Sequence, residues 1–102
     1  MDKSQADARQ CLEQQVRASE AELSIAEINQ RQQIELLGED VKVRKQMIAA
    51  FNASSSQYKN YRKKQCEFQA VLAAGGSGSS HRRLLCILEL NSQRIAHLVG
   101  NK

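Results

Sequence analysis

The chain contains no proline, and its five glycines fall at only three places along the sequence: Gly38, the cluster Gly75, Gly76 and Gly78, and Gly100. Proline and glycine are the residues that most often interrupt regular structure. The stretches between these places are rich in Ala, Gln, Glu, Leu, Arg and Lys, which favour helix. The sequence therefore predicts an all-α fold in which long helices are separated by two short turns.

Apolar residues repeat mostly at three- and four-residue steps in each stretch, as they do on the buried face of a helix. This spacing predicts three antiparallel helices, over about residues 6–37, 41–74 and 81–99. The 75–80 turn is too short to be a domain linker, so residues 1–102 are expected to form a single domain.

Several polar residues stand where the predicted helices start and stop. Gly38 is placed to end the first helix, and Asp40 to cap the second by accepting hydrogen bonds from free backbone amides. Ser79 or Ser80 is expected to cap the third helix. Residues 52–56 are weak helix formers, which favours a kink or a frayed turn within the second helix.

The charge is divided unevenly along the chain, whose net charge is +4. Residues 1–40 carry nine acids and four bases, and residues 41–102 carry two acids and eleven bases. One interpretation is a basic surface for nucleic acid or acidic lipid. The favoured interpretation is an acidic first helix that lies along a basic second helix and partly neutralises it.

The three cysteines are spaced so that they can meet in a helical hairpin. Cys66 and Cys86 are centred on residue 76, inside the second turn, and Cys11 and Cys66 are centred inside the first. The shorter connection favours a Cys66–Cys86 disulfide, with Cys11 free or bonded elsewhere. The alternative is three reduced, buried thiols in a cytosolic protein, and the spacing alone does not decide between the two.

The spacing of cysteine and histidine gives little support to a metal site or to catalysis. There is no Cys-x-x-Cys pair, and neither His81 nor His97 lies three or four residues from a cysteine. We therefore expect no metal, no cofactor and no catalytic residues.

Four further side chains lie beside the predicted apolar stripes. Arg62 and Arg94 are interpreted either as a clamp for a carboxylate ligand or, preferably, as bridges to acids of the first helix such as Glu20 or Glu27. Tyr58 and Tyr61 are predicted to lie at the edge of the core, with the ring inward and the hydroxyl outward.

The order of these residues resembles that of the LprI-like family, a small exported bacterial domain named for a lysozyme inhibitor. Residues 58–66 are similar to its aromatic-x-x-Tyr-Arg-x-x-x-Cys signature. The remaining matches, in chain order, are Cys11, Glu20, Leu23, Gly75, Gly76, Ser77, Cys86, Leu90, Arg94 and Leu98.

The chain also departs from the family pattern at several positions. Tyr58 replaces a usual Trp, Ser55 a Gln, Lys63 an Asp and Asn91 a Thr. An early cysteine that is usual in the family is absent. The resemblance implies that this missing residue pairs with Cys11 in other members, which leaves Cys66 and Cys86 for each other.

The resemblance implies an exported, non-enzymatic binding domain, periplasmic or secreted, whose partner is a lysozyme or another cell-wall hydrolase. The alternatives are an envelope domain with a structural or interaction role and no inhibitory activity, or a cytosolic basic adaptor that binds nucleic acid through residues 41–83. Residues 1–10 are mostly polar, so an exported chain is expected to be a mature form lacking its signal peptide.

Overall fold

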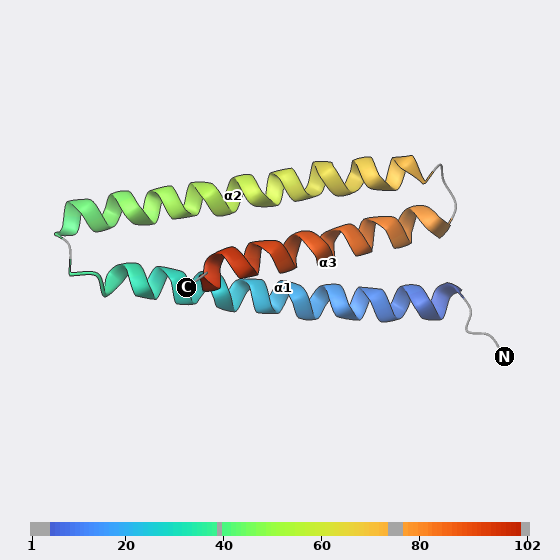
Figure 1. Cartoon of the computed structure of the whole chain (residues 1–102), viewed down its shortest axis with the longest axis horizontal. Helices are drawn as coiled ribbons and strands as arrows, with labels where there is room; N and C mark the ends of the chain where they lie inside the picture. Colours follow the sequence, from blue (N-terminus) through green and yellow to red (C-terminus); the bar gives the residue numbers. More distant parts are fainter. Residues whose placement is uncertain (1–4, 39, 74–76, 101–102) are drawn as a thin grey trace.

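The computed structural model describes residues 5–38, 40–73 and 77–100 and shows three long helices packed side by side (Figure 1). These are α1 (Gln5–Glu35), α2 (Val41–Leu72) and α3 (Ser77–Val99). They form an elongated bundle with extents of 60 × 26 × 19 Å. Every regular element in the described ranges is a helix, which confirms the all-α prediction.

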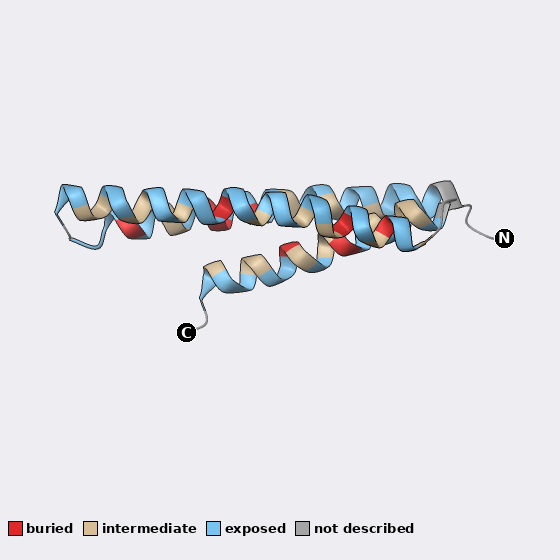
Figure 2. Cartoon of the chain, turned by 90° about the horizontal axis from the view of Figure 1, so that it is seen from above, coloured by how far each residue is buried: buried red, intermediate tan, exposed pale blue. Residues whose placement is uncertain are grey.

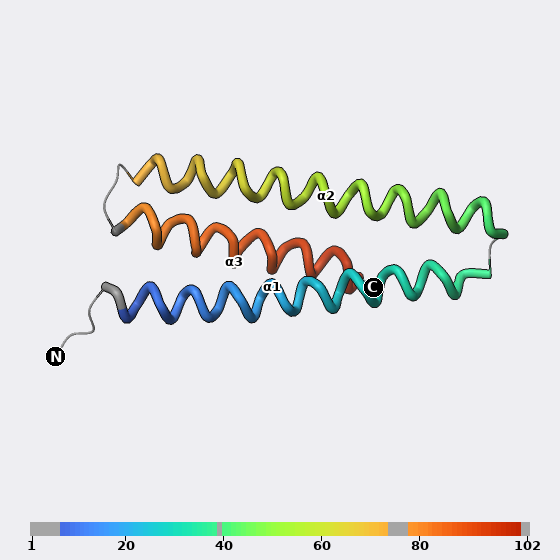
Figure 3. Tube along the Cα trace, turned by 180° about the vertical axis from the view of Figure 1, so that it is seen from behind, coloured from blue at the N-terminus to red at the C-terminus, as the bar shows by residue number. Residues whose placement is uncertain are grey.

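The helices alternate in direction, so that α1 and α3 point the same way and α2 runs against both (Figures 1 and 3). α3 packs extensively on both other helices, whereas α1 and α2 contact each other much less. Seen from above, the C-terminal half of α3 diverges from its neighbours, and the α1–α2 hairpin continues beyond it (Figure 2). The helix α3 is therefore the element that joins the bundle together.

The first turn follows the prediction. Asp40 caps α2, because its Oδ1 atom accepts a hydrogen bond of 2.9 Å from the backbone N–H of Val43. Gly38 has a φ of +73°, a left-handed backbone conformation that glycine adopts at little cost. Gly38 and Asp40 thus have the backbone conformation and the capping bond expected of a helix exit and a helix start.

Two expectations about local structure were wrong. α2 passes through residues 52–56 without interruption. Hydrogen bonds from Arg31 of α1 to Asn52 and from Arg94 of α3 to Ser55 hold this weak helix-forming segment. α3 begins at Ser77, so Ser79 and Ser80 lie inside the helix and do not cap it. The Ser79 hydroxyl instead donates a hydrogen bond of 2.8 Å to the carbonyl oxygen of Ala70, tying α3 to the end of α2.

Few of the described residues are buried, so the core is thin (Figure 2). It contains polar as well as apolar side chains. Its buried apolar residues are Leu23, Ala26, Ile34, Cys66, Ala70 and Cys86. Its buried polar residues are Glu27, Ser55 and Asn91. A core of this size gives limited hydrophobic stabilisation, so the covalent and polar contacts between helices carry more of the stability than in a larger domain.

Candidate functional site

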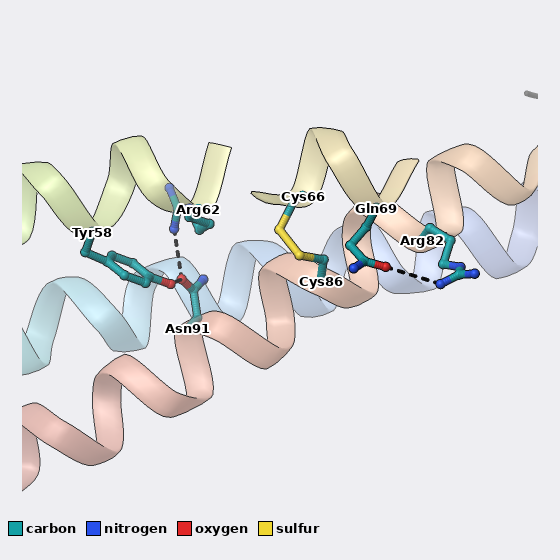
Figure 4. Close-up of a disulfide and its surroundings, with 7 residues drawn as sticks. All are labelled: Tyr58, Arg62, Cys66, Gln69, Arg82, Cys86 and Asn91. Atoms are coloured by element: carbon teal, nitrogen blue, oxygen red, sulfur yellow. Dashed lines mark hydrogen bonds between the residues drawn. A yellow bond between two sulfur atoms is a disulfide. The ribbon is translucent and has the colours of Figure 1, made fainter. Parts of the chain in front are cut away.

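A disulfide joins Cys66 of α2 to Cys86 of α3, the pairing that the shorter connection favoured and the family resemblance implied (Figure 4). The two Cα atoms are 5.4 Å apart, within the usual range for a disulfide. The bond closes a segment with a sequence separation of 20 residues, and loop closure of this length contributes about 3 kcal/mol to stability. Cys11 is exposed and carries a free thiol.

Asn91 of α3 is the centre of a polar cluster that connects all three helices, and its exposed fraction is 0%. Its Oδ1 atom accepts hydrogen bonds from the Tyr58 hydroxyl at 2.5 Å and from Nη1 of Arg62 at 2.9 Å (Figure 4). Its Nδ2 atom donates to Oγ of Ser19 at 2.7 Å and to Oε2 of Glu20 at 3.5 Å. Both ends of the buried amide are therefore satisfied.

Arg62 forms the strongest charge contact of this cluster. Its Nη1 atom lies 2.7 Å from Oε2 of Glu20, and the Arg62 side chain is largely buried. This contact confirms the interpretation of Arg62 as a bridge to an acid of the first helix. The guanidinium is thus held by Glu20 and Asn91, which leaves it poorly placed to clamp an external carboxylate.

Arg94 does not form the predicted bridge to Glu20 or Glu27. Its Nη2 atom donates a hydrogen bond of 3.1 Å to the buried Ser55 hydroxyl, and the guanidinium carbon lies 5.7 Å from the centre of the Tyr58 ring. The same group lies 5.9 Å from the centre of the Phe51 ring. Arg94 therefore contacts α2 through a hydroxyl and two aromatic faces, an arrangement that a guanidinium group favours.

Tyr58 points its hydroxyl into the bundle, so the prediction that it faces outward was wrong. Burial raises the pKa of Tyr58 above its ordinary value of 10.0, and the adjacent Arg62 guanidinium partly opposes this shift. Tyr61, one turn further along α2, is 54% exposed. Of the two tyrosines, only Tyr61 presents its side chain to solvent to a large extent.

Ion pairs between α1 and α2 neutralise part of the acidic excess of the first helix and part of the basic excess of the second. In addition to the Arg62–Glu20 pair, Nζ of Lys59 lies 3.8 Å from Glu27, and Nε of Arg44 lies 3.6 Å from Glu35. Three acids of α1 are therefore neutralised by bases of α2. This arrangement supports the interpretation of an acidic helix lying along a basic one.

The remaining residues of the family motif are scattered around the disulfide end. Ser77 begins α3, whereas Gly75 and Gly76 lie outside the described residues. Leu90 is half-buried and lines a groove between α2 and α3 with a volume of about 450 Å³. The other residues lining this groove are Tyr61, Gln65, Gln69, Arg82, Leu85, Cys86, Glu89 and Gln93.

Three polar residues that join the helices, Ser19, Ser55 and Asn91, do not stand out as site residues in the sequence. Ser19 belongs to no motif, Ser55 falls in the weak helix-forming segment, and Ser55 and Asn91 are otherwise only departures from the family pattern. The available signal was their spacing: each lies on the inner face of its predicted helix, where a polar residue needs an internal partner. Tyr58 and Asn91 belong to the cluster and Ser55 binds Arg94 beside it, so three of the four substituted family positions lie at this contact between α2 and α3.

The model of the lysozyme inhibitor LprI family matches residues 1–98. The chain belongs to the LprI family. No curated protein and no solved structure matches it. The LprI motif residues Arg62, Cys66, Cys86 and Arg94 all form contacts between α2 and α3: the cysteines through their disulfide, Arg62 through Asn91 and Arg94 through Ser55. Their internal contacts give them a role in holding this LprI chain together.

The described residues contain no group of three or more His, Cys, Asp and Glu side chains that could hold a metal ion. Within the same ranges, no helix is both long enough and apolar enough to cross a membrane.

Proposed function

We propose that this chain is an exported, non-enzymatic binding domain that inhibits a lysozyme or another cell-wall hydrolase by covering its substrate cleft. The observation that carries the proposal is the match to the lysozyme inhibitor family over residues 1–98. The Cys66–Cys86 disulfide supports export, since such bonds persist mainly in oxidising compartments.

Arg62 and Arg94 are engaged in contacts within the bundle, so we expect the partner to bind residues on the outer surface instead. Lys63 and Lys64 are exposed on α2 close to the disulfide, where the bundle is covalently fixed. Glycoside hydrolases place a pair of carboxyl groups at the scissile bond, and exposed ammonium groups complement such a cleft. A rigid scaffold also lowers the entropy lost on binding.

The overall charge limits which hydrolases bind well. Animal-type lysozymes are strongly basic, so a chain with a net charge of +4 is repelled by them at long range. We therefore expect stronger inhibition of a neutral or acidic cell-wall hydrolase than of a basic lysozyme, and weaker repulsion from the basic enzyme as salt is added.

The test of inhibition is a hydrolase assay with the oxidised protein and a small, soluble chromogenic substrate. Rising protein concentration should reduce turnover to a plateau. Replacing both Lys63 and Lys64 with Glu should weaken inhibition, whereas the matched change of Lys42 and Lys45, exposed on the same helix far from the disulfide, should leave it unchanged. Full activity of acidic, neutral and basic hydrolases at large molar excess would refute the inhibitory proposal.

Export is tested through the state of the thiols in protein taken from its native organism. Alkylation without reductant should label Cys11 alone, and labelling after reduction should add two groups, which intact mass measures directly. If all three thiols were labelled without reductant, the protein would be reduced in its own compartment and the argument for export would fail.

A further inference from the structure

The groove between α2 and α3 lies beside the disulfide and outside the polar cluster. Tyr61, Gln65 and Gln69 follow one another at four-residue steps, so they form one stripe about 12 Å long on α2. Cys86 lines the groove, and its disulfide to Cys66 holds the two helices together there. Figure 4 shows Gln69 and Arg82 reaching toward each other across the helices beside this bond, at an N···O distance of 3.3 Å.

The side chains of this groove offer an exposed ring, apolar contacts and unused polar groups. Tyr61 is 54% exposed and Leu85 is 51% exposed. Among the described residues, the side chains of Gln65, Glu89 and Gln93 have no hydrogen-bond or ion-pair partner within the chain. A primary amide both donates and accepts, so these side chains can bond to a ligand that does the same.

The balance of charge and polarity identifies the kind of ligand that fits. The groove has one base, Arg82, and one acid, Glu89, so it lacks the cluster of positive charge that a nucleic acid requires. Three glutamines also interrupt its apolar contacts, unlike the continuous apolar groove that receives an amphipathic helix. A neutral ligand with many hydroxyl or amide groups and flat apolar faces matches this lining best.

We infer that the α2–α3 groove binds a short, uncharged oligosaccharide. A sugar ring lies against the exposed face of Tyr61, and its hydroxyl or acetamido groups bond to Gln65, Gln93 and Glu89. This inference is independent of the proposed inhibition: the same chain would hold a glycan directly, whether or not it also blocks an enzyme that cuts one.

The test is a titration of the full, oxidised ¹⁵N-labelled chain, with N-acetylglucosamine oligomers in one arm and glucose oligomers in the other. Saturable chemical-shift changes are expected at the side-chain amides of Gln65 and Gln93. The sugar that saturates them at lower concentration identifies the class of oligosaccharide that the groove binds. Tyr61→Ala should raise Kd about ten-fold. Phe68→Ala should leave Kd unchanged, because Phe68 is a similarly exposed aromatic (53%) on α2 that does not line the groove.

Several results would overturn the inference. These are the absence of saturable shifts with both sugars, equal weakening by Tyr61→Ala and Phe68→Ala, or shifts at these amides with an acidic peptide or DNA and with neither sugar. Gln93→Ala, at an exposed position, gives a second variant should Tyr61→Ala lose its native circular dichroism. Because the titration contains no hydrolase, the absence of sugar binding would not contradict the inhibitory proposal. The absence of inhibition would likewise not contradict the binding of a glycan.

Discussion

Burying a primary amide is costly unless all of its hydrogen-bonding capacity is used, and Asn91 meets that condition with partners from two helices. Loss of the amide would affect more than one residue. The Tyr58 hydroxyl and the Ser19 hydroxyl would lose their partner, while Arg62 would keep Glu20. The stability of this small bundle therefore depends strongly on one polar side chain.

We expect Asn91→Ala to lower the free energy of unfolding by about 3 kcal/mol, since it leaves buried polar groups without partners. Urea denaturation followed by circular dichroism measures the change. Asn60→Ala is the control, because Asn60 is exposed on α2 and should change stability by less than about 0.5 kcal/mol. Equal stability of Asn91→Ala and the wild type would contradict the role assigned to the cluster.

The raised pKa of Tyr58 predicts a loss of stability in alkaline solution. The folded state holds the phenolic proton more tightly than the unfolded state, so this contribution is complete below pH 10 and disappears as the pH rises through the higher pKa of the folded protein. Tyr58→Phe should reduce the decline in unfolding free energy above pH 10. Tyr61→Phe, which alters an exposed tyrosine of the same helix, should retain it; equal slopes in both variants would refute the prediction.

At the level of helices, the sequence was sufficient to predict the three elements and the cap at Asp40, which depend on local spacing and on the few places where the chain can turn. The disulfide could be predicted only with the family resemblance, because the spacing of the cysteines left their oxidation state open. The sequence did not reveal that α3 starts at Ser77 or that residues 52–56 stay helical, because both depend on contacts with other helices. Asn91 was missed for the same reason, since its partners lie 29 to 72 residues away.

Two glycines at helix ends should respond in opposite directions to the same substitution. A Cβ atom at either Gly38 or Gly78 would meet nothing within 4 Å, so packing does not separate them. Gly38 has a φ of +73°, which strains any other residue, so Gly38→Ala should lower the free energy of unfolding by about 1 kcal/mol. Gly78 lies within α3, where alanine is the better helix former, so Gly78→Ala should raise the free energy of unfolding by up to about 1 kcal/mol. Thermal unfolding compares them; a shift of the same sign in both would contradict this account.

Across the whole molecule, α3 covers only part of the α1–α2 hairpin, and along α2 burial is concentrated toward the end that holds the disulfide (Figure 1). The buried residues of α2 are Ser55, Cys66 and Ala70, so its first 14 residues, 41–54, contribute none. This part of α2 lies where the α1–α2 hairpin extends past α3 (Figure 1). Few buried contacts favour local opening.

We therefore expect backbone amides of residues 45–54 to exchange with deuterium at least about ten times faster than those of residues 58–70. Mass spectrometry of peptic fragments measures both segments in one sample, so each serves as the control for the other. Equal protection along α2 would show that the helix opens as one unit, in conflict with the observed distribution of burial.

The position of the Asn91 amide bears on the alignment of the three helices along the bundle. Its oxygen faces donors on α2, and its nitrogen faces acceptors on α1. Sliding α3 by one helical turn, about 5.4 Å, would carry the amide away from both sets of partners. A single buried side chain therefore opposes shifted registers of the bundle, as a lone buried asparagine does in a coiled coil.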